Sequence, residues 1–360
     1  MQVSSGEKNP PILRGYGIYD KSELEFIKKN KLLRHIYVGV SAACDLRCIY
    51  CQTKSGKAMP GEMTIDERTN LLDQAKKLGC DLVHIAARGE PTVDPLFLPQ
   101  LEHIHKLKMT PVIFSHGGNI NKYWADNLYK NDASVIIKIH SMDPTLQDFF
   151  ARVKGYTKRR DAGLAMLIKR GFNKTNPTRL GADILVMKKN YDEIEKIFIW
   201  CRENNIFPLV KPFLVNERGK SKYVLENLYV EPLKIRDLYY RLAKIDKEKF
   251  GYIWTPTPPY AGISCNYYLY HILVTVMGDV WPCIGLEHLR LGNIRDGKLE
   301  EFWNHPTMDK IRNIKNNLSG VCQNCQKLKN DECYGCPCRR TYLKGPSKTF
   351  ICNSCWEDNL

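Results

Sequence analysis

The chain has 360 residues with a formal net charge of +15, and 43% of its residues are hydrophobic. This length allows roughly two domains, and the composition excludes collagen, coiled-coil and disordered classes. No apolar run approaches the ~20 residues of a membrane-spanning helix, and the N-terminus lacks the basic-then-apolar pattern of an export signal. We therefore expect a cytoplasmic globular protein with no membrane partner.

Strand and helix patterns alternate along the first two thirds of the chain. Short β-branched runs predict strands at 35–41, 82–87, 111–115, 134–140, 180–187 and 207–214. Helical periodicity predicts helices between them at 64–78, 95–108, 121–130, 143–152 and 191–205. Thr64 and Glu67 form a capping box at the start of the first of these helices. Such alternation predicts an α/β fold with a parallel sheet, closed or partly closed.

Fourteen cysteines are the most unusual feature of the composition. Structural disulfides are rare in a reducing compartment, and clustered cysteines there are typical metal ligands. Three cysteines crowd residues 44–51, and nine more follow residue 264. Cys80 and Cys201 stand alone at the end of one predicted helix and inside another, where buried apolar thiols are expected.

The first cysteine group, Cys44-x3-Cys48-x2-Cys51, lies on the loop that leaves the first predicted strand. Three thiolates on one short loop can hold three irons of a cubane cluster, which leaves the fourth iron open to a non-protein ligand. A zinc-binding loop is the alternative, although zinc sites usually pair two short C-x2-C arms.

With Tyr50 at the aromatic position, this loop resembles the signature C-x3-C-x-aromatic-C of the radical S-adenosylmethionine (SAM) superfamily. The resemblance implies a partial (β/α)6 TIM-like barrel with its site at the C-terminal ends of the strands. It implies a [4Fe–4S] cluster on Cys44, Cys48 and Cys51 that binds SAM at the open iron, with Tyr50 at the cofactor site. One electron, from a flavodoxin- or ferredoxin-type donor, would cleave SAM to a 5′-deoxyadenosyl radical that abstracts a substrate hydrogen.

Two further segments resemble SAM-binding positions of the family. The turn ARGEP at 87–91 is similar to the Gly-Gly-Glu-Pro turn that holds the SAM amino group, which makes Glu90 a candidate ligand. Arg88 replaces the first glycine, so the backbone approach there can differ. Ser141 follows the fourth strand, where the family often places a hydroxyl on the SAM ribose. Asp143 fits an N-cap for the next helix.

Arg218 and His116 are the remaining candidates near the predicted site. Arg218 belongs to a turn after the sixth strand that is similar to a Gly-Arg turn of the family. It could reach a carboxylate or lie in solvent, and the two interpretations weigh equally. His116 follows the third strand and could contact substrate, although a lone histidine more often has a structural role.

The later cysteines begin with Cys265-x12-Gly278-x4-Cys283, which resembles the SPASM extension of radical SAM enzymes. The resemblance implies one or two auxiliary [4Fe–4S] clusters in a small cysteine-rich domain. One would use Cys265, Cys283 and Cys336 or Cys338; the other would use Cys322, Cys325, Cys333 and Cys352 or Cys355. A zinc ribbon on the paired C-x2-C arms is the alternative for the tail, but the upstream cysteine loop favours iron–sulfur.

These patterns predict an N-terminal extension at 1–33, a radical SAM partial barrel at 34–225, a helical linker at 226–262 and an auxiliary cluster domain at 263–360. Basic patches at 154–160 and 339–348 could meet an anionic ligand. Because only about 33 residues precede the first predicted strand, we expect no leader-peptide-binding domain, which favours a small or carrier-linked substrate. No nucleic-acid-binding module is recognisable, so a nucleic-acid partner is not expected.

The main hypothesis is therefore a radical SAM oxidoreductase or isomerase. It would abstract hydrogen from a polar, anionic small molecule, such as a sugar or nucleotide, and so cause oxidation or epimerisation. One alternative is a peptide or protein maturase that forms a cross-link or oxidises Cys or Ser. The other is a zinc-stabilised binding protein without redox chemistry.

Overall fold

The computed structural model describes residues 8–86, 88–213, 215–257, 259–286, 289–314 and 326–330. The seven cysteines from Cys322 onward, and the basic patch at 339–348, lie outside the described residues. No helix in the described ranges is both long and apolar enough to cross a membrane.

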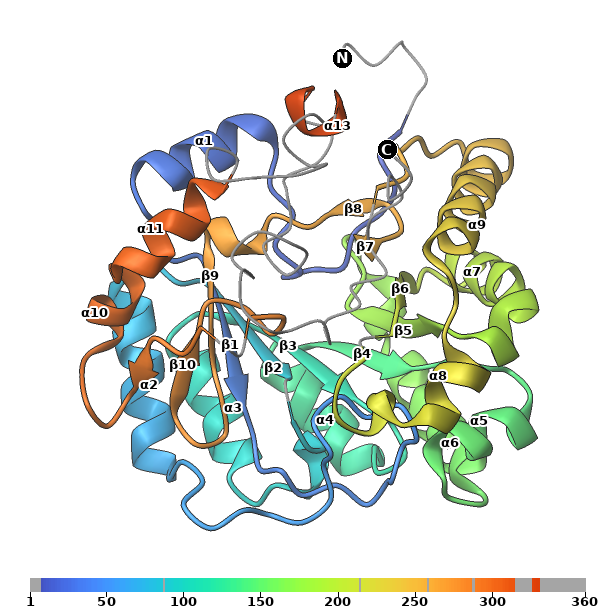
Figure 1. Cartoon of the computed structure of the whole chain (residues 1–360). Helices are drawn as coiled ribbons and strands as arrows, with labels where there is room; N and C mark the ends of the chain where they lie inside the picture. Colours follow the sequence, from blue (N-terminus) through green and yellow to red (C-terminus); the bar gives the residue numbers. More distant parts are fainter. Residues whose placement is uncertain are drawn as a thin grey trace.

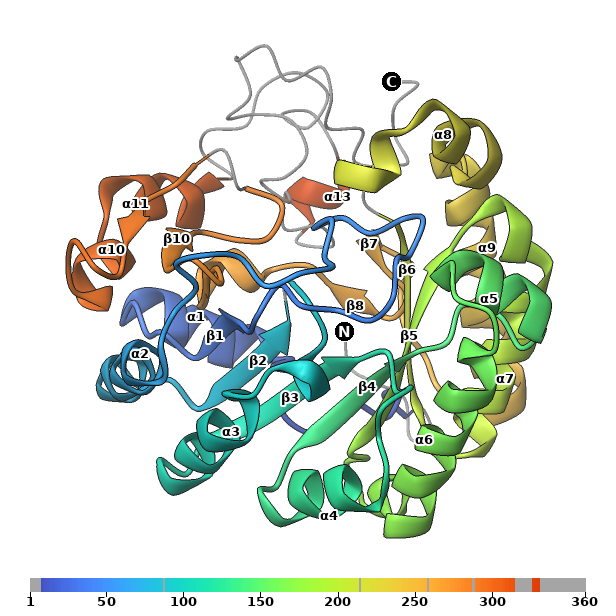
Figure 2. The same cartoon turned by 90° about the horizontal axis from the view of Figure 1, so that it is seen from below.

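Six parallel strands form the centre of the fold, in chain order across the sheet. They are β1 (His35–Gly39), β2 (Leu82–Ala86), β3 (Thr110–Ser115), β4 (Ser134–Lys138), β5 (Leu180–Val186) and β6 (Phe207–Pro212). The intervening helices are α2 (Ile65–Lys77), α3 (Phe97–Lys106), α4 (Lys122–Lys130), α5 (Pro144–Ala151) and α7 (Ile194–Glu203). Helices form an arc outside the strands (Figures 1 and 2). The predicted alternation and its partial barrel are confirmed.

The expected helix starts follow their local sequence. The Thr64 hydroxyl accepts a hydrogen bond from the Glu67 amide, and the Glu67 carboxylate accepts one from the Thr64 amide, so the capping box at α2 is confirmed. Asp143 caps α5 by accepting from the Thr145 amide at 2.7 Å. These caps satisfy amides that the first turn of a helix leaves unpaired.

Between β1 and β6, one helix was not predicted. Helix α6 (Tyr156–Arg170) lies between α5 and β5, where the sequence suggested a basic patch. Arg160 is buried in it and donates to the Ser141 carbonyl oxygen at 3.2 Å. Arg160 therefore belongs to the interior, and the exposed patch at 154–160 is smaller than expected.

The chain after residue 263 continues the same sheet. Strand β9 (His271–Val274) pairs in parallel with β1, and β10 (Asp279–Trp281) and β11 (Gly292–Asn293) follow it antiparallel. The sheet thus ends at β6 on one side and β11 on the other. The start of the predicted auxiliary domain is joined to the barrel by backbone hydrogen bonds.

Smaller elements surround this sheet. The helices are α1 (Lys21–Lys29), α8 (Lys222–Leu228), α9 (Pro232–Ile245), α10 (Leu299–Trp303), α11 (Pro306–Arg312) and α13 (Gln326–Lys329). The 3-10 turns are η1 (Pro91–Val93), η2 (Phe172–Lys174), η3 (Lys188–Glu193), η4 (Glu217–Lys220) and η6 (Tyr267–Leu269), and η5 (Asp246–Phe250) is a π-helical turn. The hairpin β7 (Pro259–Tyr260) and β8 (Ile263–Ser264) packs beside β6, where Ala261 donates to the Val210 carbonyl.

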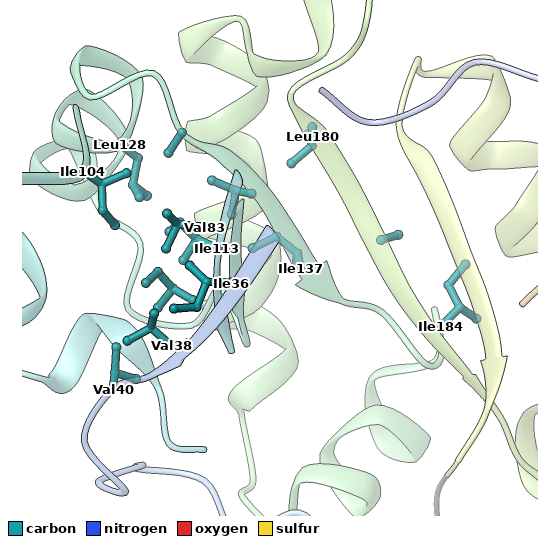
Figure 3. Close-up of a cluster of buried hydrophobic side chains, with 14 of the residues drawn as sticks. Ile36, Val38, Val40, Val83, Ile104, Ile113, Leu128, Ile137, Leu180 and Ile184 are labelled. Carbon is teal, nitrogen blue, oxygen red and sulfur yellow. The ribbon is translucent and has the colours of Figure 1, made fainter. Parts of the chain in front are cut away.

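The strands alternate between two environments, because successive side chains point to opposite faces. One face carries branched apolar residues that pack with Ile104 of α3 and Leu128 of α4 (Figure 3). The alternate positions carry aromatic and charged residues: Tyr37, Phe114, Lys138, Asp183, Lys211 and His271. The lumen of the partial barrel is therefore polar and aromatic, and the apolar core lies between sheet and helices.

Candidate active site

A cavity of about 220 Å³ lies inside the barrel. Five cysteines line it: Cys44, Cys48, Cys51, Cys265 and Cys283. The first three come from the loop after β1, and the last two flank β9 and β10 in the chain. The fold thus brings both described cysteine groups to one cavity.

The three-cysteine loop is held by backbone hydrogen bonds to two other segments. Cys44 donates to the Gly56 carbonyl at 3.0 Å. Arg47 and Ile49 donate to the last residues of α5, with distances of 3.2 Å to the Ala151 oxygen and 3.0 Å to the Phe150 oxygen. This anchoring fixes the loop before any ligand is added.

The three thiols differ in electrostatic surroundings. Burial raises the pKa of Cys44 to about 12 and also raises the pKa of Cys48. Burial acts in the same direction on Cys51, but the Lys138 charge and hydrogen bonds from Thr53 outweigh it and lower the pKa to about 7. Iron binding replaces these protons, since thiolates are the metal-ligating form.

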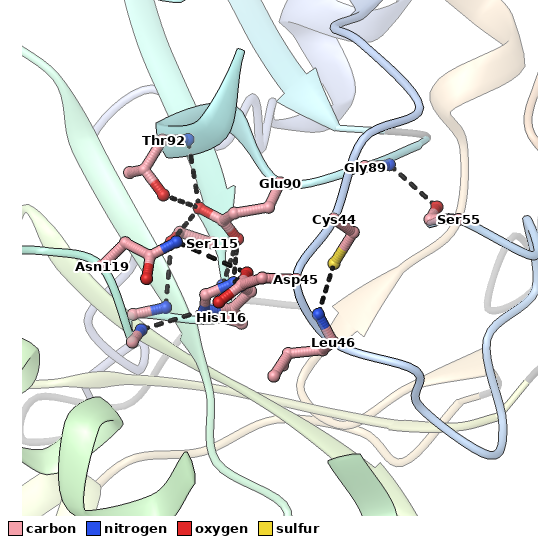
Figure 4. A network of polar contacts seen from close by, with 12 residues as sticks. Cys44, Asp45, Leu46, Ser55, Gly89, Glu90, Thr92, Ser115, His116 and Asn119 are labelled. Carbon is pink, nitrogen blue, oxygen red and sulfur yellow. Dashed lines mark hydrogen bonds and ion pairs between the residues drawn. The ribbon is translucent and has the colours of Figure 1, made fainter. Parts of the chain in front are cut away.

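Gly89 and Glu90 connect this loop to the ends of β2 and β3. Gly89 has φ +70°, and a Cβ there would lie 1.8 Å from the Ser41 carbonyl oxygen, so only glycine fits. The buried Glu90 carboxylate accepts from the Ser115 hydroxyl at 2.7 Å and from the His116 amide at 2.8 Å (Figure 4). Gly89 lines the cavity, whereas Glu90 braces its wall. The role of Glu90 in SAM binding stays a prediction.

His116 also contacts the cysteine loop, through the side chain of Asp45. The Gly118 amide donates to His116 Nδ1 at 2.9 Å, so the ring carries its proton on Nε2, which lies 2.7 Å from Asp45 Oδ1 (Figure 4). Hydrogen bonds from His116 and Arg159 hold the pKa of Asp45 well below its usual value. His116 is absent from the cavity lining, and this geometry fits the structural interpretation.

The other three candidates occupy different places. Tyr50 lines the cavity and lies 2.6 Å from His140 Nε2 through its hydroxyl. Ser141 is fully buried behind the cavity, and its hydroxyl donates to Glu193 at 2.7 Å. Arg218 is half-buried and lines the cavity, and its guanidinium donates to the Ser55 carbonyl at 2.7 Å. Their contacts with SAM stay predictions.

Charged residues on three neighbouring strands were missed by sequence reasoning. Lys211 of β6 lies 2.9 Å from Asp183 of β5, and Lys138 of β4 is the register partner of Asp183. Burial alone would lower the pKa of Lys138, but nearby Cys48, Cys51 and Asp183 raise it. Among the described residues, the Lys138 ammonium has charged neighbours but no hydrogen-bond partner. A charged residue at an alternate position of an apolar strand was the available signal.

Models of two known protein families match the segments that supply the cysteines of this cavity. A sequence model of the radical SAM superfamily matches residues 38–201, and one of the SPASM iron–sulfur cluster-binding domain matches residues 265–326. The chain therefore belongs to the radical SAM superfamily and carries a SPASM domain. Its cofactors are a [4Fe–4S] cluster with SAM and auxiliary iron–sulfur clusters.

Several known proteins are similar over most of the chain. The AdoMet-dependent heme synthase of Methanosarcina barkeri is 24% identical, covering 83% of this chain and 90% of its own. The mycofactocin maturase MftC of Mycolicibacterium smegmatis is 24% identical, covering 81% and 75%. Streptococcus suis SuiB bound to S-adenosylmethionine has a TM-score of 0.63 at 18% identity, covering 87% and 78%. SuiB bound to its precursor peptide SuiA has a TM-score of 0.59 at 18% identity, covering 81% and 70%.

The described residues fit these cofactors. Three thiols from one loop line the cavity and leave one iron of a cubane without a protein ligand from that loop. Gly89, with its close backbone approach to Ser41, and Lys138 also line this cavity. Cys265 and Cys283 supply two thiols for an auxiliary cluster, and the other expected ligands lie outside the described residues.

Proposed function

We propose that this enzyme is a peptide maturase, which abstracts a hydrogen atom from a residue of a peptide substrate. The carrying observation is the single cavity lined by Cys44, Cys48 and Cys51 and also by Cys265 and Cys283. A residue inserted there would reach the SAM site and the auxiliary cluster together. The mycofactocin maturase and the SuiB–SuiA complex support a peptide substrate over the sugar or nucleotide of the main sequence hypothesis.

The cofactors, when bound, supply a 5′-deoxyadenosyl radical as the hydrogen-abstracting group. The residues of the chain supply the environment for that chemistry. The aromatic wall formed by Tyr37, Phe114 and Tyr267 excludes water from the inserted residue. Lys211, oriented by Asp183 at 2.9 Å, offers an ammonium to a polar group of the substrate. The electron donor, expected to be a flavodoxin or ferredoxin, stays a prediction.

One observation favours a second candidate, an anionic small molecule. The Lys138 ammonium faces the cavity without a hydrogen-bond partner in the described part of the chain, which is the arrangement expected for binding a carboxylate. The similarity to a heme synthase makes a tetrapyrrole carboxylate the specific form of this candidate. Like the main hypothesis from the sequence, this candidate has an anionic small molecule as substrate.

Deuterium transfer separates the two candidates. Peptides encoded by reading frames beside the gene are synthesised with deuterium at carbon, and each is incubated anaerobically with the reconstituted enzyme, SAM and reductant. We expect mass spectrometry to find deuterium in 5′-deoxyadenosine from one of these peptides. Transfer from a deuterated tetrapyrrole carboxylate alone, or SAM cleavage with no transfer from any peptide, contradicts the peptide assignment.

A further inference from the structure

Unpaired positive charge lies on the protein surface around the cysteine loop. Five exposed basic side chains form this basic face: Lys54, Lys57, Arg152, Lys154 and Lys158. Within the part of the chain that the structure describes, none of the five forms a hydrogen bond or an ion pair, and none lines the cavity. The basic face is therefore free, and the substrate chemistry proposed above does not use it.

Two neighbouring segments contribute to the basic face. The first is the cysteine loop with the residues that follow it, and the second is the junction between α5 and α6 (Figures 1 and 2). The Arg47 amide donates to the Ala151 oxygen at 3.2 Å, and the Arg159 guanidinium lies 2.9 Å from Asp45. These contacts join the two segments, so the five cations flank the stretch that carries Cys44 and Cys48.

The carboxylates of residues 44–62 and 143–161 all have partners within the protein. Asp45 accepts from His116 and Arg159, and Glu62 accepts from the Ala42 amide at 2.8 Å. The other three carboxylates belong to Asp143, Asp148 and Asp161, which accept from Thr145, Thr157 and Arg160, respectively. The negative charge of these segments is thus paired, whereas the positive charge of the basic face is not. An approaching protein meets a positive field here.

The position of the basic face suits delivery of electrons to the loop cluster. The three loop thiols line the cavity, where SAM and the substrate take up the interior space. A protein reductant must therefore approach from the surface of the molecule. Cys44 and Cys51 are only half-buried, so the loop cluster lies a short way beneath that surface. Electron transfer between proteins is fast only when the two redox centres come close together.

We propose that the basic face is the docking surface for a small acidic electron-carrier protein that reduces the loop cluster. One electron leaves the carrier, and the cluster passes from its 2+ to its 1+ state. When the carrier is a flavodoxin, its anionic hydroquinone becomes the neutral semiquinone, so no proton is transferred. Complementary charge raises the association rate and orients the two partners. Redox encounters of this kind use small interfaces, which lets the carrier leave after each electron.

The test compares a protein reductant with a chemical one. The reconstituted holoenzyme is incubated anaerobically with SAM, without substrate, and with a limiting amount of an acidic flavodoxin in its hydroquinone state. Chromatography measures 5′-deoxyadenosine. At low ionic strength, we expect Lys154→Glu/Lys158→Glu to slow its formation about tenfold, because the substitutions reverse two attractive charges. Added salt should slow the wild type more than the variant, since salt screens the attraction.

The matched control is Lys28→Glu/Lys29→Glu, which makes the same change of charge on two exposed lysines of α1. Helix α1 precedes β1 and lies at the other end of that strand from the cysteine loop (Figure 1). Its rate with flavodoxin should equal that of the wild type. Dithionite is a small reductant that needs no docking surface, so it should drive SAM cleavage equally in all three proteins.

Binding gives a readout that does not depend on SAM cleavage. Calorimetry of oxidised flavodoxin with the holoenzyme should show a dissociation constant about tenfold higher in Lys154→Glu/Lys158→Glu only. An unchanged rate with flavodoxin in this variant, or an equal loss in the control, would overturn the docking assignment. An equal loss with dithionite would also overturn it, because the substitutions would then act on the cluster or SAM site. No peptide is present, so the result is independent of the peptide assignment.

Discussion

The cysteine loop and the lumen of the barrel differ in whether their polar side chains have hydrogen-bond partners. Around the loop, Asp45 and Glu90 both have protein hydrogen-bond partners. In the lumen, both ring nitrogens of His35 and the Nδ1 atoms of His84 and His271 find no partner among the described residues. The loop is thus organised in advance, whereas the lumen holds buried ring nitrogens without a protein partner, and of these three histidines His271 lines the cavity.

This difference matches the two tasks of the cavity. A cofactor site benefits from ligands fixed by their neighbours, because little rearrangement is then needed on binding. A buried polar group without a partner costs about 1–3 kcal/mol. Such groups are expected where a substrate or ordered water completes the hydrogen bonding. The contrast supports the proposal that the cofactors bind at the loop and the substrate binds in the lumen.

The largest expected effect comes from removing the loop thiols. The Cys44→Ala/Cys48→Ala/Cys51→Ala variant should lose about four irons per chain, together with all SAM cleavage. Iron and sulfide analysis after anaerobic reconstitution measures the loss. Cys201→Ala is the control, since Cys201 is a fully buried thiol that does not line the cavity, and its iron content should be unchanged. An equal iron content in both variants would show that the three loop cysteines do not hold a cluster.

A backbone substitution tests how the loop is organised. Gly89→Ala should lower the free energy of unfolding by roughly 2–4 kcal/mol, because positive φ and overlap with the Ser41 carbonyl add together. Gly251→Ala shares the positive φ, +71°, but its Cβ would meet nothing within 4 Å. Guanidinium denaturation of the control should show a loss of about 1 kcal/mol. Similar losses in both variants would mean that the close approach to Ser41 has no effect.

The smallest of these effects tests the lumen. Lys138→Met should slow substrate-dependent formation of 5′-deoxyadenosine about tenfold, equivalent to about 1.4 kcal/mol. Cleavage of SAM without substrate should stay within about twofold of wild type. High-performance liquid chromatography of both reactions measures the ratio. An equal loss of rate in both reactions would mean that Lys138 acts on cofactor binding and not on substrate binding.

The sequence supported most of the fold because its strand and helix signals are local. The β-branched runs predicted β1 to β6, and Thr64 and Asp143 marked two helix starts. Helix α6 was missed because its charged first turn, around Arg159 and Arg160, looked like a solvated patch. The pairing of β9 with β1 could not be predicted from the sequence, because no local pattern specifies a partner strand so distant in the chain.

The candidate site divides in the same way. The spacing of Cys44, Cys48 and Cys51 is readable from the sequence and led directly to the family. The positions of Lys138, Asp183 and Lys211 around one lumen depend on strand register and curvature, which no single segment encodes. The same holds for the contact between Tyr50 and His140, which are 90 residues apart.

The pairing of β9 with β1 has a consequence for synthesis of the chain. His35 and His271 are register partners although about two thirds of the polypeptide separates them. While the ribosome is still making the middle of the chain, β1 can pair with β2 on one side only, and its other edge stays open to wrong partners. Folding of the strand that leads into the cysteine loop is therefore completed late, after the SPASM segment has begun to emerge.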